Sequence, residues 1–269
     1  MGSAIIQRSE AMKPLTLAVF FLATIISCVR GEVLIVADEF PAMEVLSARL
    51  KSEENIASKI IKQTELPGAL ESFSAVVVYI HGALTERAEN AFIRYAENGG
   101  KLVLLHHSIS SGKRRNAHWF SFLGVSLPEG DLANGGYKWI EGVSFSLVDL
   151  NPQHFVMTNK MSWPEKTDYG SNSSKGTPLP AFTLHETEVY VNHVHTEPRM
   201  LLMGLKYDEK ATGKTYMQDT AGWVKPAGKG WVIYLMPGHA KHDFETPTYG
   251  RVVLNAIVWP AGAANKPGQ

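Results

Sequence analysis

The sequence contains a single cysteine, Cys28, among 269 residues. One thiol cannot form a disulfide within the chain, and zinc sites built from several cysteines are excluded as well. Neither sign of charge is in excess, because 26 Lys and Arg residues balance 26 Asp and Glu residues. A neutral chain provides no electrostatic footprint for nucleic acid, so we expect no nucleic-acid partner.

Several catalytic and phosphate-binding motifs are missing too. The chain has no P-loop lysine motif and no G-x-G-x-x-G after its first apolar strand, so we expect no nucleotide cofactor. It also lacks the G-x-S-x-G nucleophile elbow. Ser108 follows two histidines, but without this elbow its hydroxyl is better explained as stabilising a turn than as a nucleophile.

The N-terminal region carries an uncharged apolar run, LTLAVFFLATIIS, which follows Met12 and Lys13. The run is too short to span a bilayer and has the length of a signal peptide core. We therefore predict a signal peptide over 1–31, with Met12 as an alternative start, and a periplasmic or extracellular protein. Either cleavage leaves Glu32 as the first residue, or Cys28 carries a lipid anchor. An uncleaved membrane anchor is the third alternative.

The chain from 32 to 262 is predicted to form one α/β domain, followed by a disordered tail over 263–269. Three apolar runs are typical of strands buried on both faces, EVLIVAD, AVVVYIHG and KLVLLHHS. Helical spacing over 41–52 and 86–98 separates them, and Thr85 can cap the second helix. This alternation predicts a doubly wound, mostly parallel sheet with helices on both faces.

The middle of the chain has a different pattern. The segments 137–149 and 181–195 mix polar and apolar residues, as antiparallel strands with one solvated face do. The stretch 160–180 between them is rich in Pro, Gly and Ser and predicts a long exposed loop. Buried-strand character then returns, and Thr246 with Pro247 predicts the start of a final helix.

Histidine is concentrated where the predicted parallel strands end. Ligands bind beyond these carboxyl ends in open parallel sheets. The four ends carry Asp38-Glu39, His81-Gly82, His106-His107-Ser108 and Pro237-Gly238-His239. Because His106 and His107 end an extended strand, we expect their side chains to point to opposite faces, so that only one lines the cleft.

Other residues have both functional and structural interpretations. His242 and Asp243 follow His239 and can orient or extend a site, or else face solvent and cap a turn. His193 and His195 have chelating i, i+2 spacing, which is also common on a surface strand. Trp163 and Tyr169 can stack on sugar rings, whereas Trp119 and Phe120 are expected in the core.

Several spaced segments resemble the ThuA-like (trehalose-utilisation) family, from about Glu32 to Gly262. The segments are NGGKLVLLHHS, NAHWFSFLG, LHETEVYVN, GKGWVIYLMPGH and NAIVW. The resemblance implies a flavodoxin-like fold similar to class I glutamine amidotransferases, and a role with disaccharides or their keto derivatives. Two positions depart from the pattern. His154-Phe155 replaces a frequent His-Pro pair, and His106-His107-Ser108 offers no nucleophilic cysteine, which excludes thiol-based amidotransfer.

Together these observations predict a protein that acts on a disaccharide or keto-sugar. The predicted acid/base residues are His107 and His239, with Glu188 as their carboxylate partner. The predicted substrate contacts are His81, Trp163 and Tyr190. A divalent metal such as zinc, bound by His107, His239 and His242, is one hypothesis, and acid/base chemistry without a metal is the other. A non-catalytic carbohydrate-binding module and a surface accessory protein remain alternatives, so enzyme activity stays open.

Overall fold

The computed structural model describes residues 1–2, 31–170 and 176–261. The predicted signal peptide, apart from residues 1, 2 and 31, lies outside this part of the chain, as do Cys28 and the predicted tail 263–269. Within the described ranges, no helix is both long enough and apolar enough to cross a membrane.

The described residues form one large sheet, one two-stranded sheet and six α-helices. The helices are α1 (Pro41–Glu54), α2 (Glu86–Glu97), α3 (Trp119–Leu123), α4 (Phe155–Thr158), α5 (Lys241–Glu245) and α6 (Pro247–Val258). The strands are β1 (Val33–Ala37), β2 (Ser58–Ile61), β3 (Ala75–Tyr79), β4 (Lys101–Leu105), β5 (Val125–Ser126), β6 (Lys138–Asp149), β7 (Glu165–Tyr169), β8 (Thr177–Val191), β9 (Val194–His195), β10 (Met200–Glu209), β11 (Lys214–Ala227) and β12 (Gly230–Leu235).

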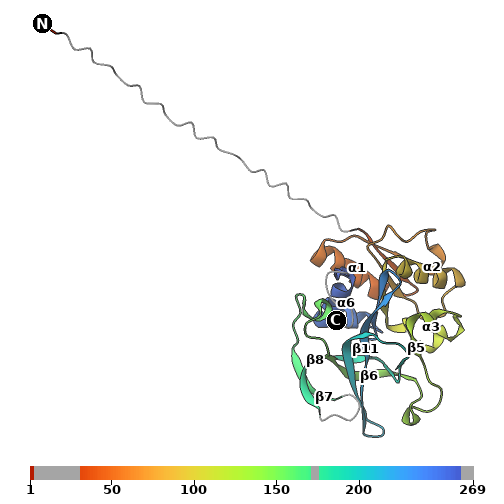
Figure 1. The fold of residues 1–269 in the computed structure, drawn as a ribbon. Coiled ribbons are helices and arrows are strands. Elements are labelled where there is room, and N and C mark those ends of the chain that lie inside the picture. Colours follow the sequence, from red (N-terminus) through yellow and green to blue (C-terminus); the bar gives the residue numbers. More distant parts are fainter. Residues whose placement is uncertain (3–30, 171–175, 262–269) are drawn as a thin grey trace.

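The large sheet has a parallel half and an antiparallel half. Its strand order is β2-β1-β3-β4-β12-β11-β10-β6-β8-β7. The first five strands run parallel and the others pair antiparallel. The crossovers from β1 and from β3 proceed in opposite directions along the sheet, so right-handed connections place their helices on opposite faces. Figure 1 shows α1 and α6 on one side of the strands and α2 and α3 on the other.

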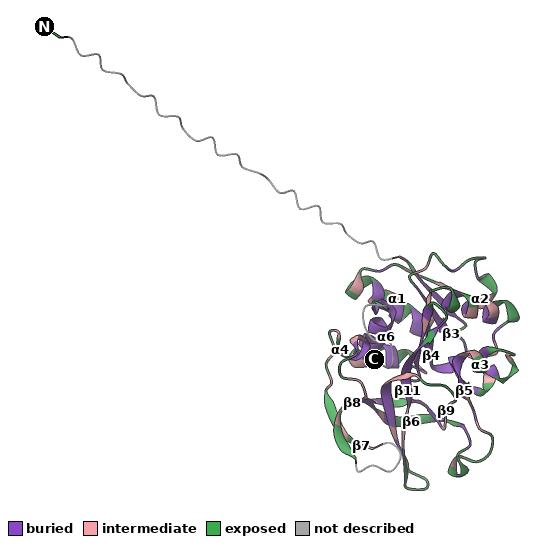
Figure 2. Ribbon diagram, in the orientation of Figure 1, coloured by how far each residue is buried: buried purple, intermediate pink, exposed green. Residues whose placement is uncertain are grey.

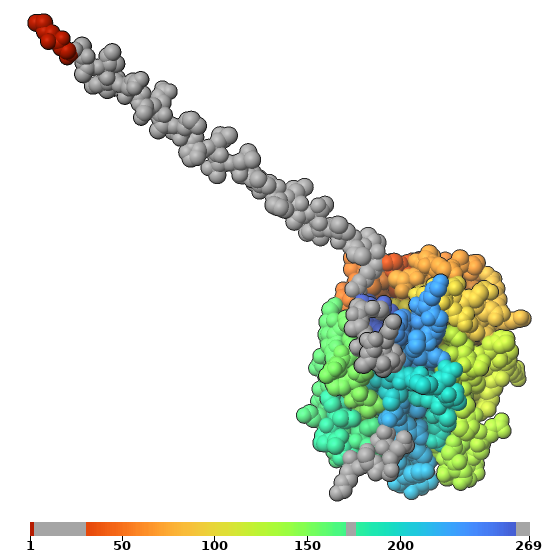
Figure 3. Space-filling view, viewed as in Figure 1, coloured from red at the N-terminus to blue at the C-terminus, as the bar shows by residue number. Residues whose placement is uncertain are grey.

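The core lies where these helices cover the parallel strands. Every residue of β1 and β3 is buried, as the purple strands in the middle of Figure 2 illustrate. In Figure 3 the cyan and blue segments, which include β10–β12, lie between the green residues of β7 and β8 and the yellow segment on the right. The predicted doubly wound α/β fold with an antiparallel excursion is confirmed.

Local signals in the sequence explain the helix boundaries. Helix α1 begins at Pro41 and ends at Glu54, and its C-cap Asn55 has a left-handed φ of 53°. The Thr85 side chain accepts a hydrogen bond from the Ala88 amide and caps α2, as predicted. Helix α6 begins at Pro247, also as predicted.

The predicted loop over 160–180 is partly wrong. Strand β7 forms within it and pairs antiparallel with the first residues of β8. Two of these, Pro178 and Pro180, pair only with β7, because the pairing of β8 with β6 begins at Ala181. Proline is tolerated at such one-sided positions, so its presence did not exclude a strand. Strands β2 and β11 were not predicted either.

Candidate functional site

Four side chains converge beyond the carboxyl ends of the parallel strands. They are His106, His107, Glu188 and His239, and we call them the His-Glu cluster. One potential ligand atom from each lies within 4.8 Å of the others. Glu188 Oε2 is the common neighbour, at 2.6 Å from His106 Nε2, 3.6 Å from His107 Nε2 and 3.2 Å from His239 Nδ1. Three imidazoles and a carboxylate form a donor set that can hold a transition metal.

Both adjacent histidines belong to the cluster because the backbone changes course after β4. The strand ends at Leu105, and His106–Ser108 form a 3₁₀ turn in which His106 has a φ of 38°. The rings of His106 and His107 then lie edge to face, with centroids 4.2 Å apart. The expectation that they point to opposite faces is wrong, because it assumed an extended backbone.

A bulge brings Glu188 to the cluster. Opposite the β8 segment Leu184–Thr187, the register with β6 shifts, and Glu186 has a φ of 50°. Such a bulge bends its strand and redirects the side chains that follow it. The Glu188 side chain is only 5% exposed, so its carboxylate lies against the three imidazoles rather than in solvent.

Close packing fixes the position of His239. Gly238 has a φ of 105°, and a Cβ atom there would lie 2.5 Å from the Tyr249 hydroxyl. Glycine therefore meets both a backbone and a packing requirement in the turn after β12. The Tyr79 hydroxyl also donates a hydrogen bond of 2.7 Å to the His239 carbonyl, which ties the end of β3 to this turn.

The hydrogen bonds define the tautomer of His106. Its Nδ1 lies 2.6 Å from the Met236 carbonyl oxygen, which can only accept, so Nδ1 carries a proton. In the neutral ring, Nε2 then carries no proton, and it faces the Glu188 carboxylate. This contact is favourable only when a proton or a cation lies between the two atoms. Among the described residues, Nδ1 of His107 has no hydrogen-bond partner, and Nδ1 of His239 has none in good alignment although it lies 3.2 Å from Glu188 Oε2.

The protonation states suit a metal site. Burial lowers the pKa of His106 and His107, which keeps both imidazoles neutral. Burial would raise the pKa of Glu188, but its close contacts with the His106 and His239 side chains outweigh this effect and lower the pKa to about 2. The Glu188 hydrogen bond in turn raises the pKa of His239. Neutral His106 and His107 and the ionised Glu188 are the forms that bind cations, whereas His239 has to give up its proton when a cation binds.

A shallow hollow of about 170 Å³ opens beside the cluster. His107, Glu188 and Tyr190 line it together with His81 and Trp139. His81 lies with its ring centroid 3.6 Å from that of His107, and Asp38 Oδ1 is 2.9 Å from its Nδ1. Tyr190 stacks on His106 at 4.5 Å. The strand-end pattern thus placed His81, His107 and His239 in one neighbourhood.

Four residues that the sequence analysis considered lie elsewhere. His242 is exposed, and its Nε2 is 3.0 Å from the His185 carbonyl. Trp163 packs against Phe182, and its indole NH donates to the Met157 carbonyl. The structure therefore does not bring either residue into the cluster. His193 and His195 also lie outside it.

Two residues near the site were missed by sequence reasoning. Trp139 is 53% exposed and borders the hollow, although its strand pattern did not distinguish it from other aromatics. Lys113 is fully buried, and its ammonium group contacts four backbone carbonyls of the strand-end loops, those of Ile80, His81, Gly82 and His107. Lys113 is the third residue of the 3₁₀ turn Ser111–Arg115, and nothing in the sequence distinguishes it from Arg114 and Arg115 beside it.

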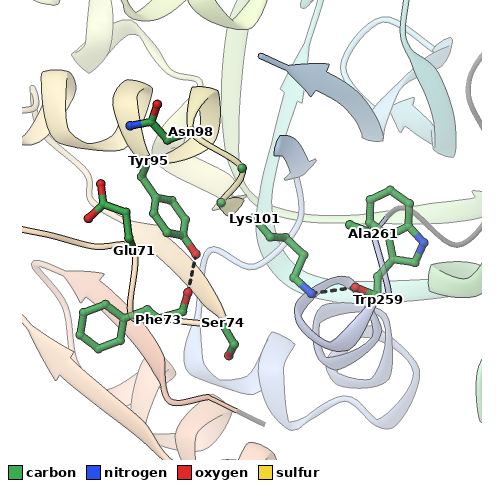
Figure 4. A pocket seen from close by; sticks show the side chains of 10 residues that line it. Glu71, Phe73, Ser74, Tyr95, Asn98, Lys101, Trp259 and Ala261 are labelled. Atoms are coloured by element: carbon green, nitrogen blue, oxygen red, sulfur yellow. Dashed lines mark hydrogen bonds between the residues drawn. The ribbon is translucent and has the colours of Figure 1, made fainter. Parts of the chain in front are cut away.

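A larger hollow of about 360 Å³ lies at the opposite, amino-terminal end of the parallel strands (Figure 4). Two polar side chains that line it already form hydrogen bonds within the chain. The Tyr95 hydroxyl donates to the Phe73 carbonyl, and the Lys101 ammonium donates to the Trp259 carbonyl. The His-Glu cluster, with unpartnered imidazole nitrogens, is the better candidate site.

Residues 32–260 match the protein family described as ThuA, trehalose utilisation. The chain belongs to the ThuA family. Membership supports a role related to trehalose utilisation in general terms. No curated protein is significantly similar in sequence.

Several solved structures share the fold of this chain. A ThuA-like protein from Bacteroides uniformis superimposes with a TM-score of 0.61 at 17% identity, covering 89% of this chain and 95% of that one. A cytoplasmic protein from Salmonella typhimurium gives a TM-score of 0.52 at 13% identity, covering 84% and 98%. A β-galactosidase from Rahnella gives 0.51 at 11% identity, covering 84% of this chain and 31% of that enzyme. At these identities the likeness concerns the fold alone.

Proposed function

We propose that this ThuA protein is a metal-dependent enzyme that acts on a disaccharide or keto-sugar at the His-Glu cluster. The observation that carries the proposal is the arrangement of four ligand atoms within 4.8 Å of one another. Burial keeps His106 and His107 neutral, and the contacts of Glu188 with His106 and His239 keep its carboxylate ionised. The family assignment supports the carbohydrate class of the substrate.

The donor set favours zinc or a similar first-row transition metal over magnesium or calcium. Imidazole suits transition metals, whereas magnesium and calcium prefer oxygen ligands. His106 provides a further argument, since its Nδ1–H donates to the Met236 carbonyl and leaves Nε2 for the cation. Such outer hydrogen bonds usually orient histidine ligands.

The residues around the hollow fit proton transfer beside a sugar carbonyl. The bound cation would stabilise negative charge on the carbonyl oxygen. His81, which Asp38 orients, would accept the proton and return it. Trp139 offers an exposed ring face to a sugar. Loss of a proton next to the carbonyl would then permit elimination of the glycosidic oxygen, which takes up a proton and leaves as an alcohol, and water can add to the double bond that forms.

Metal analysis of the full chain, purified without a histidine tag, tests the metal centre directly. We expect close to one equivalent of zinc after reconstitution, and loss of most of it in Glu188→Gln and His106→Ala. The exposed His118 lies outside the cluster, so His118→Ala is the matched control and should retain the metal. If neither zinc, manganese, iron nor nickel binds in the wild-type chain, the metal centre does not exist.

Product analysis separates an enzyme from a binding module. The alternative of a non-catalytic module has one observation in its favour, the exposed Trp139 at the edge of a small hollow. The metal-loaded chain would be incubated with trehalose and with its keto derivative, and products followed by NMR. Product that disappears with Glu188→Gln supports the enzyme. Saccharide binding without any product supports the module.

Export is also part of the proposal and depends on the apolar run before Cys28 alone. Fractionation of cells that produce the full chain, with intact mass of the released and membrane-bound forms, tests it. A mass that corresponds to a start at Glu32 supports cleavage, and a lipid-modified Cys28 supports anchoring. A full-length chain that stays in the cytoplasm contradicts both.

A further inference from the structure

A hollow of about 290 Å³, which we call the side hollow, adjoins the hollow beside the His-Glu cluster. Ser111 and Trp139 line both, so the two are neighbouring parts of one cleft. Each alone is smaller than the roughly 300–1,000 Å³ that is usual for small-molecule sites, but together they fall within this range. All their lining residues belong to the described part of the chain. The cleft therefore suits a ligand longer than one sugar ring.

Trp139 lies at the junction of the two hollows. It is 53% exposed, although tryptophan is usually highly buried. From Gly31 onward, Val194 is the only other large apolar side chain among the described residues with comparable exposure. An aromatic ring offers a flat apolar face on which a sugar ring can stack. A ligand that extends from the cluster into the side hollow would pass over this ring.

The charge of the lining residues changes sign along the cleft. Glu141 and Glu188 line the hollow beside the cluster, and none of its lining residues, all of them described, is a lysine or arginine. In the side hollow, Arg114 and Lys138 face a single acidic residue, Glu129. One end of the cleft therefore suits a cation or neutral hydroxyl groups, and the other end suits an anion.

Arg114 is held in place but keeps binding capacity. It belongs to the 3₁₀ turn Ser111–Arg115, and its Nη2 donates a hydrogen bond of 2.9 Å to the Leu127 carbonyl. Its Nη1 is 3.6 Å from Glu129 Oε1, which is too long for a hydrogen bond. The Glu129 side chain is 89% exposed, so this ion pair contributes little and is easily displaced.

The second cation of the side hollow is Lys138, the first residue of β6, directly before Trp139. Lys138 is exposed and forms no ion pair with any residue that the structure describes. A planar guanidinium binds a carboxylate or a phosphate through two parallel hydrogen bonds, and an ammonium adds a point charge. The pair is thus equipped to recognise an anionic group on a ligand that also stacks on Trp139.

We propose that the cleft binds an acidic disaccharide, with its reacting ring at the His-Glu cluster and the carboxylate or phosphate of its second ring at Arg114 and Lys138. The second ring is the part that leaves as an alcohol when the glycosidic bond breaks. The position of the reacting ring rests on the proposed function, whereas the anion site itself needs no metal.

Titration calorimetry of the full chain at low ionic strength, with and without zinc, tests the anion site. The probes are D-glucose, D-glucuronate and D-glucose 6-phosphate. We expect an acidic sugar to bind ~3- to 10-fold more tightly than D-glucose to the zinc-free chain, with an advantage that shrinks as salt is added. A larger gain for D-glucuronate assigns a carboxylate, and a larger gain for D-glucose 6-phosphate assigns a phosphate.

Arg114→Gln should reduce the affinity for the acidic sugars to that for D-glucose and leave D-glucose binding unchanged. Arg115→Gln is the matched control, because it removes the same charge from an exposed neighbour that does not line the side hollow. Arg114→Lys should retain part of the advantage. Glu129→Gln should increase the affinity for the acidic sugars ~2- to 5-fold, because it removes the competing carboxylate.

Equal affinities of the wild type for all three sugars would overturn the proposal. So would an advantage that survives Arg114→Gln, or one that Arg115→Gln abolishes to the same extent. An advantage that requires zinc and is lost in Glu188→Gln would place the anion on the metal and would also overturn it. A chain that binds no metal but keeps an Arg114-dependent advantage would contradict the proposed metal-dependent reaction and still support the anion site.

Discussion

Thr187 donates its hydroxyl hydrogen to Asp243 Oδ2 across 2.6 Å. Both residues adjoin the cluster, since Thr187 precedes Glu188 and Asp243 lies in α5, four residues after His239. The same Oδ2 accepts a hydrogen bond from the Ala240 amide at 3.1 Å. The fully buried Asp243 thus fixes the turn after β12 to β8, and with it the distance between His239 and Glu188.

Loss of the Asp243 side chain should weaken the metal site, although none of the proposed metal ligands is changed. We expect Asp243→Ala to lower the free energy of unfolding by about 2–3 kcal/mol, because it leaves the Thr187 hydroxyl and the Ala240 amide unpaired in the interior. Zinc affinity should fall ~10- to 100-fold, as for other outer partners of metal ligands. Urea unfolding and competition with a zinc chelator measure the two effects. The exposed Asp208 provides a control, since Asp208→Ala should change neither quantity measurably.

Lys113 should be the most important cation for stability among the described residues near the site. Its ammonium group contacts the carbonyls of Ile80, Gly82 and His107 at 2.7, 2.6 and 3.0 Å. Lys113→Met would leave these buried acceptors unpaired, at a cost of about 3–5 kcal/mol in unfolding free energy. Lys138 is exposed, so Lys138→Met should have an effect within about 0.5 kcal/mol. Equal urea midpoints for the two variants would refute the role of Lys113.

The parallel half of the fold and the neighbourhood of the site could be predicted from sequence. Unbroken apolar runs show which strands are buried on both faces, and the carboxyl ends of such strands meet along one edge. His81, His107 and His239 were placed together by that rule alone. A short crossover explains why β4 lies beside β3, whereas β12, which precedes His239, pairs with β4 only after the long antiparallel excursion.

What could not be predicted depends on irregular backbone. His106 joins the cluster only because its positive φ ends the extended backbone of β4 at Leu105. The sequence His106-His107-Ser108 contains no signal for this change of conformation. The approach of Glu188 depends on a bulge whose position is set by pairing with β6, which is distant in sequence. Sequence patterns do not distinguish Trp163 from Trp139. Only tertiary packing places Trp163 against Phe182 and Trp139 at the hollow.

These two tryptophans should behave oppositely when truncated. Trp139 is 53% exposed, so Trp139→Ala should change the unfolding free energy by no more than about 0.5 kcal/mol. It should nevertheless weaken saccharide binding at the cluster ~3- to 10-fold, through loss of an aromatic face. Trp163→Ala should cost about 2–4 kcal/mol of stability and leave saccharide affinity unchanged. Titration calorimetry and urea unfolding of both variants decide the matter, and the reverse pattern would assign the sugar contact to Trp163.

The stability of the fold should fall on mild acidification, partly because of His154. This residue caps α4, and its Nδ1 accepts a hydrogen bond of 3.2 Å from the Val156 amide. Burial lowers its pKa to about 4, whereas an unfolded histidine titrates near 6.5. Between these values the unfolded chain binds more protons than the folded chain. The stability is therefore complete above pH 6.5 and is lost as the pH falls toward 4.

His154→Asn isolates this contribution, because asparagine can still cap the helix but does not titrate. From pH 7.5 to pH 5, we expect the wild type to lose about 1–2 kcal/mol more unfolding free energy than the variant. Urea unfolding at the two pH values, at constant ionic strength, gives this difference directly. The buried His193 and His195 titrate in the same direction but are present in both proteins, so their effects cancel. An equal loss in wild type and variant would show that His154 becomes protonated in the folded chain at no cost.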